Sequence, residues 1–244
     1  MRREINRITW IDRRGVLKKP LRLAIAADLH NRPFDDLVPC LREAEAILVP
    51  GDLTDRHHYG PQTEAERFLA EAPDIAPVWC SIGNHERRME EGAAWRARME
   101  KSRVHVLDND TALLREDVLL GGLSSRGEGD AANTAAVDAL AAETDRFRLL
   151  LCHHPEYYFP EVAGKGIDLT IAGHAHGGQF RLFGQGLFAP GQGFFPRLTG
   201  GFYDGERLLV SRGLSNHSPI PRINNPGELI LLTLLPASGE LPSV

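Results

Sequence analysis

Residues 21–30 read LRLAIAADLH, an apolar run that ends in Asp28 and His30. The same arrangement recurs in residues 47–55 (ILVPGDLTD), 78–86 (VWCSIGNHE), 148–154 (RLLLCHH) and 169–176 (LTIAGHAH). Apolar runs of this length are typical of buried strands. Because ligands of open α/β sheets bind at the carboxyl ends of the strands, we expect the five polar ends to converge on one site.

Helical segments separate these strands. The candidate helices span residues 35–46, 61–72, 87–100 and 134–143. Pro61 would stand in a first helical turn, where its missing N–H leaves no hydrogen bond unmade. Strands that alternate with helices predict an α/β fold with largely parallel pairing.

The chain changes character after Gly173. Residues 177–203 are rich in Gly, Pro and Phe, and Asp204-Gly205 between two apolar runs predicts a hairpin. Residues 229–234 (LILLTL) read as a last strand. This end should add antiparallel strands to the same domain, so we expect a single layered α/β domain over residues 1–244.

The composition limits the classes of protein to which this chain can belong. The chain has 244 residues with 42% hydrophobic and 25% charged residues, and its net charge of -5 gives no reason to expect nucleic acid as an obligate partner. The three cysteines form no C-x-x-C pair, which favours a reduced, cytoplasmic protein. No apolar run reaches the roughly 18 residues of a membrane span, and the N-terminus lacks the apolar core of a signal peptide.

The N-terminal segment is basic. Its cations are Arg2, Arg3, Arg7, Arg13, Arg14, Lys18, Lys19 and Arg22, against Glu4 and Asp12. A solvated edge strand explains this pattern, and the alternative is a patch that contacts a membrane surface.

The polar strand ends have the chemistry of a metal centre. Gly173-His174-x-His176 is the strongest single motif, since two closely spaced histidines after a glycine suit ligation from a loop. Oxygen and imidazole ligands without thiolate favour Mn, Fe, Zn, Co or Ni over Ca. We expect two divalent ions, which in such sites lie about 3.5–4 Å apart, generate a hydroxide nucleophile and hold both the attacking and leaving oxygens. Asp52 is the candidate bridge, because Gly51 lets the backbone approach closely.

These motifs, in this order, resemble the calcineurin-like metallophosphoesterase superfamily, whose pattern is D-x-H, G-D-x-x-D, G-N-H-(D/E), a strand-end H, and G-H-x-H. The segments GHAHGGQ (173–179) and SRGL (211–214) are similar to its stand-alone bacterial phosphodiesterase branch. The resemblance implies two facing mixed β-sheets flanked by α-helices. It also implies that Asp28, His30, Asp52 and His176 hold one metal, and that Asp52, Asn84, His153 and His174 hold the other. Ala175 stands where the branch usually has Thr.

The same resemblance implies roles for neighbouring residues. His85 would contact the phosphate and protonate the leaving oxygen, whereas Asp55 and Glu86 would orient imidazoles. His153 and His154 both follow the apolar run. Strand alternation and the family pattern favour His153 as the ligand, with His154 pointing away to line the cleft or pack nearby.

We therefore expect a metal-dependent phosphodiesterase that acts on a small or lipid-linked phosphate ester. The alternatives are a pyrophosphatase acting on a nucleotide-sugar lipid, and a non-catalytic scaffold, which should lack ligands that this chain retains. Arg212 is either a phosphate-binding or a surface residue. The phenylalanines at 180, 183, 188, 194 and 195 form either an apolar substrate wall or simple packing beneath a Gly-rich loop.

Overall fold

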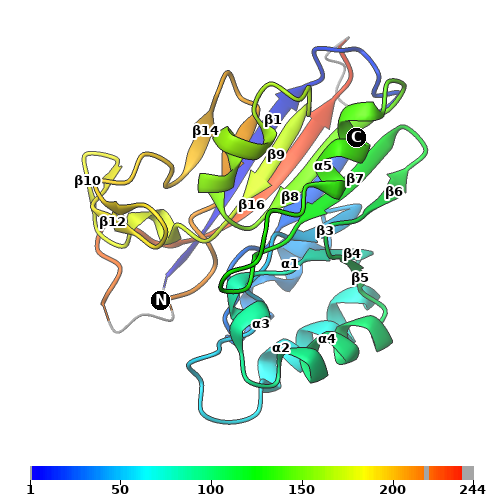
Figure 1. The fold of residues 1–244 in the computed structure, drawn as a ribbon. Helices are drawn as coiled ribbons and strands as arrows, with labels where there is room; N and C mark the ends of the chain where they lie inside the picture. Colours follow the sequence, from blue (N-terminus) through cyan, green and yellow to red (C-terminus); the bar gives the residue numbers. More distant parts are fainter. Residues whose placement is uncertain (1, 217–219, 238–244) are drawn as a thin grey trace.

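Two six-stranded mixed sheets form the framework of the protein, seen in a computed structural model that describes residues 2–216 and 220–237 (Figure 1). The first sheet has the order β1 (Arg3–Ile11), β16 (Gly227–Leu235), β2 (Leu21–Ile25), β3 (Ala46–Val49), β4 (Val78–Ser81), β5 (His105–Leu107). The second has the order β14 (Gly201–Tyr203), β15 (Leu208–Val210), β9 (Leu169–Ala172), β8 (Phe147–Cys152), β7 (Val118–Leu123), β6 (Thr111–Arg115). The largely parallel pairing that the strand–helix alternation predicts is confirmed for β2–β3–β4–β5 and for β7–β8–β9–β15.

Side-chain alternation along the strands sorts the apolar residues into layers. Leu23 and Ile25 of β2 join Leu149 and Leu151 of β8 in a core between the two sheets. Their neighbours on β2 and β3 turn outward and pack with helical residues such as Phe68. The outer face of β8 packs likewise against the helix near residue 140. The expected sandwich of two mixed sheets flanked by helices is therefore confirmed.

The helices are shorter than the sequence pattern predicts. They are α1 (Val38–Leu41), α2 (Thr63–Glu71), α3 (Asn84–Arg88), α4 (Gly92–Lys101) and α5 (Ala135–Ala142), with short turns at Asp35–Leu37, Ala72–Asp74, Pro155–Tyr157, Tyr158–Val162 and His176–Gly178. The predicted helix over 35–46 is wrong at its end, because Glu45 N–H already bonds Arg22 O at 2.8 Å and Ala46 opens β3. The predicted helix over 87–100 is interrupted, because Met89 is extended (ψ 148) between α3 and α4.

The C-terminal part follows the expectation. Asp204 and Gly205 lie in the four-residue turn, residues 204–207, that connects β14 to β15 in an antiparallel hairpin. Strand β16 lies antiparallel to β2 and parallel to β1. Two small hairpins that the sequence pattern does not predict, β10 (Arg181–Leu182) with β11 (Gln185–Gly186) and β12 (Phe188–Ala189) with β13 (Gly193–Phe194), project from one side of the molecule (Figure 1).

The basic N-terminal segment supplies β1, which is the edge strand of its sheet as expected. Six of its eight cations pair with carboxylates of other segments: Arg3 with Asp36, Arg7 with Glu43, Arg13 with Glu206, Arg14 with Asp168, Lys18 with Glu116 and Arg22 with Glu45. Acidic partners thus offset most of the positive charge of the segment, which speaks against the alternative of a membrane-contacting patch. Within residues 2–216 and 220–237, no helix has the length and apolar character needed to cross a bilayer.

Candidate metal centre

The polar ends of β2, β3, β4, β8 and β9 meet at one edge of the two sheets. Four groups of side chains have ligand atoms within 4.8 Å of one another: Asp28–His30–His176, His30–Asp52–His85, Asp28–Asp52–His153 and His153–His154–His174. Asn84 joins them, with its Oδ1 atom 3.1 Å from His153 Nε2. The structure thus brings together all the residues that the sequence singles out as ligands: Asp28, His30, Asp52, Asn84, His153, His174 and His176.

His153 shows why this cluster suits a cation. Its Nδ1 lies 2.8 Å from the carbonyl oxygen of Pro50, so Nδ1 carries the proton of the neutral ring. Its Nε2 lies 3.1 Å from both Asp52 Oδ2 and Asn84 Oδ1. All three of these atoms are acceptors when the ring is neutral, so a proton or a metal ion must lie among them. Accordingly, although burial alone would lower the pKa of His153, the Asp52 carboxylate raises it to about 10.

The two central carboxylates are buried without an ion pair to Lys or Arg among the described residues. Asp28 and Asp52 are 0% and 1% exposed, and their only ion-pair partners among the described residues are histidines. Burial, opposed by His153, raises the pKa of Asp28 to about 6. Burying carboxylates is costly unless positive charge accompanies them, and metal coordination supplies that charge.

The histidines differ in how their rings are oriented. His30 Nδ1 lies 3.1 Å from Thr54 O, which leaves Nε2 directed at the cluster, the usual arrangement of an imidazole that binds a metal. His176 is the exception, because the Arg222 guanidinium donates to its Nδ1 at 2.8 Å. The neutral ring then carries its proton on Nε2, so ligation through Nε2 requires the Arg222 contact to break. The sequence pattern gives no signal for Arg222.

The site holds its backbone in a costly conformation. Positive φ angles occur at Asp28 (55°), His30 (48°), Asp52 (55°), His174 (64°) and His176 (46°). Each such non-glycine residue costs on the order of 1–3 kcal/mol, and residues of this kind cluster at functional sites. Hydrogen bonds between loops hold the conformation, including His30 N–H to Asp52 O at 3.1 Å. Five of the seven predicted ligands therefore lie on strained backbone.

Two glycines allow the loops to lie back to back. A Cβ atom on Gly83 would come within 2.1 Å of Asp52 Oδ1, and one on Gly51 would come within 2.7 Å of His153 Nδ1. The close backbone approach expected at Gly51 is therefore present. Gly83 is the residue on the facing loop, and it too leaves no room for a side chain.

Glu86 joins the same two loops. Its carboxylate accepts hydrogen bonds from the N–H groups of Asp52 and Gly83 at 2.9 Å and of Thr54 at 2.8 Å. The expectation that Glu86 orients an imidazole is wrong, because backbone amides and the Thr54 hydroxyl occupy its oxygens. Asp55, in contrast, lies beside an imidazole, with its Oδ1 3.5 Å from His85 Nδ1.

His85 and His154 both face the cluster. His85 Nδ1 accepts the backbone N–H of Arg56 at 3.0 Å, so the neutral ring carries its proton on Nε2, which lies 3.9 Å from Asp52 Oδ2. His154 does not point away as expected. The turn at Pro155 carries its ring to 4.0 Å from that of His174, and its Nδ1 contacts Glu156 at 3.0 Å.

A pocket of about 290 Å³ opens over the cluster. Besides site residues, it is lined by Arg56, Arg88, Glu156, Tyr157, Pro190 and Gly191, none of which the motifs identify. Arg56 and Arg88 are exposed and form no ion pair with a carboxylate within the described parts of the chain. Each follows a metal-site motif by one or two positions, which is the only sequence signal for them. Arg212 does not line this pocket, and Glu228 and Glu4 engage its guanidinium, which speaks against its interpretation as a phosphate-binding residue.

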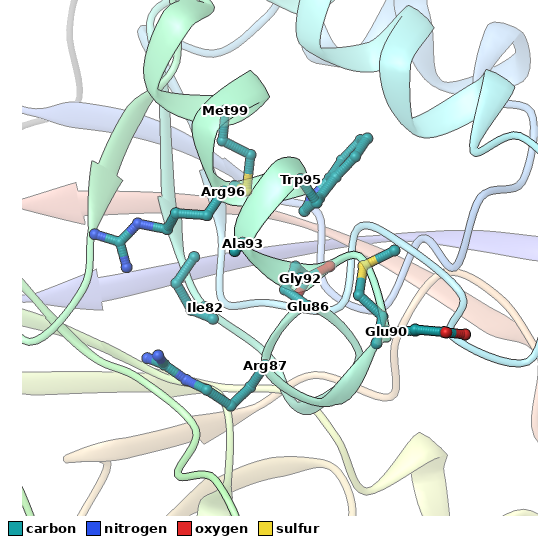
Figure 2. A pocket seen from close by; sticks show the side chains of 10 residues that line it. Ile82, Glu86, Arg87, Glu90, Gly92, Ala93, Trp95, Arg96 and Met99 are labelled. Carbon is teal, nitrogen blue, oxygen red and sulfur yellow. The ribbon is translucent and has the colours of Figure 1, made fainter.

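A second pocket, of about 310 Å³, lies between α3 and α4 and holds none of the predicted ligands. Figure 2 shows Trp95, Arg96 and Met99 projecting from α4 and Arg87 from α3 around it. Its lining is mainly apolar side chains and arginine stems, without the convergent metal-binding groups of the first pocket. The side chains able to bind metal therefore lie at the pocket over the histidines.

Comparisons with known proteins agree with this site. Residues 21–178 match the family described as calcineurin-like phosphoesterase. The chain is 26% identical to an uncharacterized metallophosphoesterase, Cj0846, of Campylobacter jejuni, over 89% of this chain and 60% of that protein. It is 25% identical to the uncharacterized protein YpbG of Bacillus subtilis, over 89% of this chain and 82% of that protein. The sulfate thiohydrolase SoxB of Thermus thermophilus shares the fold, with a TM-score of 0.51, 13% identity, and coverage of 91% of this chain and 57% of that chain.

The family match covers well over half of the chain, and its range contains every residue of the cluster. The chain spans 60% of the length of the Campylobacter relative, so that protein has further sequence outside the match. Members of the family use divalent metals, and the buried carboxylates and histidines fit such ions. The chain belongs to the calcineurin-like phosphoesterase family.

Proposed function

We propose that this chain is a phosphodiesterase with a dinuclear metal centre. Asp28, His30, Asp52 and His176 would hold one ion, and Asp52, Asn84, His153 and His174 the other. The observation that carries the proposal is the position of Asp52, whose carboxylate belongs both to the group with His30 and to the group with Asp28 and His153. Divalent ions supply an activated water and neutralise phosphate charge.

The side chains around the ions would divide the remaining work. The guanidinium groups of Arg56 and Arg88, at the edge of the pocket, would attract and orient an anionic ester. His85 would protonate the leaving oxygen, because the Arg56 amide fixes its proton on the Nε2 atom. Glu86 would keep the Asp52 and Asn84 loops in register.

A preference for diesters over monoesters rests on the resemblance of residues 173–179 and 211–214 to the bacterial phosphodiesterase branch. A pyrophosphatase is the second candidate, and one observation favours it. Arg56 and Arg88 together offer two guanidinium groups, which suits a substrate with a second phosphate beside the scissile one.

The test is hydrolysis of bis-p-nitrophenyl phosphate, of p-nitrophenyl phosphate and of a dinucleoside pyrophosphate by chelator-treated protein, with Mn, Fe, Zn, Co or Ni added in turn. We expect metal-dependent turnover, fastest on the diester, and about two ions per chain by elemental analysis. Asp52→Asn should remove most of the activity, whereas Asp74→Asn, a surface change, should retain it.

Each component of the proposal can fail separately. Full activity in the presence of chelator would contradict metal dependence. One tightly bound ion at full activity would contradict the dinuclear centre, and faster turnover of the pyrophosphate would replace the first candidate by the second.

A further inference from the structure

Four phenylalanines form an exposed aromatic surface on the two projecting hairpins. This surface consists of Phe183 in the β10–β11 turn, Phe188 and Phe194 on β12 and β13, and Phe195 directly after β13. Phe183, Phe194 and Phe195 are 100%, 79% and 72% exposed. Packing beneath the loop, one of the two interpretations of these residues, is therefore wrong for these three side chains. Each exposed ring leaves apolar surface in water that contact with an apolar environment would bury favourably.

The hairpins hold these rings outward in a defined way. Phe188 and Phe194 are directly opposite in the β12–β13 register, and their rings meet edge-on with centroids 5.5 Å apart. The amide of Phe195 donates to Leu187 O at 2.9 Å, and the amide of Leu187 donates to Phe180 O at the same distance. These bonds tie the second hairpin to the first, so the aromatic surface is part of the fold.

The segment that carries the aromatic surface has no acidic side chain of its own. Residues 169–203 contain no Asp or Glu but include Arg181 and Arg197. Arg197 is exposed and has no carboxylate partner within the described parts of the chain, whereas Arg3, Arg7 and Arg13 of the N-terminal segment are paired. Exposed aromatic rings together with an exposed cation are typical of protein surfaces that enter the interface of an anionic bilayer.

The same hairpin reaches the metal pocket. Pro190 and Gly191, in the turn between β12 and β13, line the pocket over the histidines. The turn packs tightly there, since a Cβ atom on Gly191 would lie 2.0 Å from Glu156 Oε1. A partner in contact with Phe194 and Phe195 would therefore lie next to the opening of the pocket.

We propose that the aromatic surface docks this protein on anionic lipid bilayers, with the phenylalanine rings inserted at the headgroup level and Arg197 against lipid phosphates. The rings sit on projecting turns, a shape that suits insertion into a fluid interface. The proposal concerns binding alone and stands whether or not the phosphodiesterase assignment is correct.

The experiment is co-sedimentation of the full chain with large unilamellar vesicles of phosphatidylcholine, with and without one quarter phosphatidylglycerol. We expect binding to the anionic vesicles, and at least a tenfold loss in Phe194→Ser/Phe195→Ser. Arg197→Glu should weaken binding to the anionic vesicles and leave any binding to neutral ones unchanged. Leu113→Ser is the matched control, because Leu113 is also exposed but lies on β6, on the other side of the molecule (Figure 1).

Circular dichroism and turnover of a small chromogenic ester check that the double variant keeps its fold and its site. Absence of wild-type binding to any vesicle would overturn the proposal, as would equal binding by the double variant. A wild-type dimer in solution that the double variant converts to a monomer would also overturn it, since the aromatic surface would then be a contact between copies of this chain.

Discussion

Nε2 of His153 lies 3.1 Å from Oδ2 of Asp52, although the two residues follow strands of different sheets. Asp52 comes after β3 of the first sheet, and His153 comes after β8 of the second. The metal cluster is therefore assembled by the packing of one sheet on the other. Changes in the core between the sheets should displace ligands without touching them.

The adjacent histidines should differ in their effect on the metals. His153→Ala removes the nitrogen that faces Asp52 and Asn84, so we expect loss of metal from this site and almost no activity. His154→Ala should cost much less, because the His154 ring is held by Glu156 at the wall of the pocket. Elemental analysis and turnover of both variants provide the check. A larger loss of metal in His154→Ala would show that His154 is the ligand.

His85→Gln should retain both metals and slow turnover about 10²-fold or more, the usual scale of general acid catalysis. The reason is that His85 Nδ1 accepts the Arg56 amide, which leaves a proton and not a lone pair on Nε2. His57→Gln is the control, since its ring lies 5.5 Å from that of His85 but does not line the pocket. Loss of one metal equivalent in His85→Gln would make His85 a ligand.

Glu86→Gln should weaken the connection between the Asp52 and Asn84 loops. The Gln side chain has only one acceptor oxygen. Its NH₂ group would face backbone N–H groups that now donate hydrogen bonds to the Glu86 carboxylate. We expect a loss of about 1–3 kcal/mol in the free energy of unfolding, the cost of unsatisfied buried donors, together with weaker metal binding. Urea unfolding and metal titration measure the two effects, with exposed Glu90→Gln as control. If the metal affinity of this variant were unchanged, Glu86 would contribute to the stability of the fold and not to metal binding.

Asp117 should make stability depend on pH. Burial would raise its pKa, but hydrogen bonds from the Arg115 guanidinium and the Lys18 amide outweigh burial and hold the pKa below its usual range. A lowered carboxyl pKa stabilises the fold above the unfolded value of about 3.9, and this contribution disappears as the pH falls through the folded value. Asp117→Asn should therefore cost about 1–3 kcal/mol at pH 7 and progressively less below pH ~4. Urea unfolding of the wild type and the variant at pH 7 and below pH ~4 tests this. An equal difference in their free energies of unfolding at the two pH values would contradict it.

The sequence predicts the strands that carry ligands better than the rest of the fold. The apolar runs ending at Asp28, Asp52 and His174 are long enough to identify, and their polar ends have no other common explanation. Strand β7 escapes prediction because Gly121-Gly122 looks like a turn. In the structure Gly122 instead permits close backbone contact, since a Cβ atom there would lie 2.3 Å from Leu107 O.

Residues whose position depends on tertiary contact could not be predicted. Arg222 is far in sequence from His176, and only the folded chain places its guanidinium on that ring. Alternation along an extended strand predicts opposite directions for His153 and His154, but the turn at Pro155 brings both rings into the cluster. The interruption at Met89 has one weak signal in the sequence, Gly92, which opens α4 and whose N–H bonds Met89 O at 3.0 Å.

The position of β16 has a consequence for synthesis of the chain. Residues 227–235 are inserted between β1 and β2, and all but one of them are buried. While the ribosome is still translating the preceding segment, β1 has no neighbour and β2 has one bare edge. The first sheet is complete only after residue 235 has left the exit tunnel. The metal ligands that follow β2 and β3 are therefore synthesised early, but β2 pairs with β16 only late. Until then the open edges are sites where a chaperone or another nascent chain can pair.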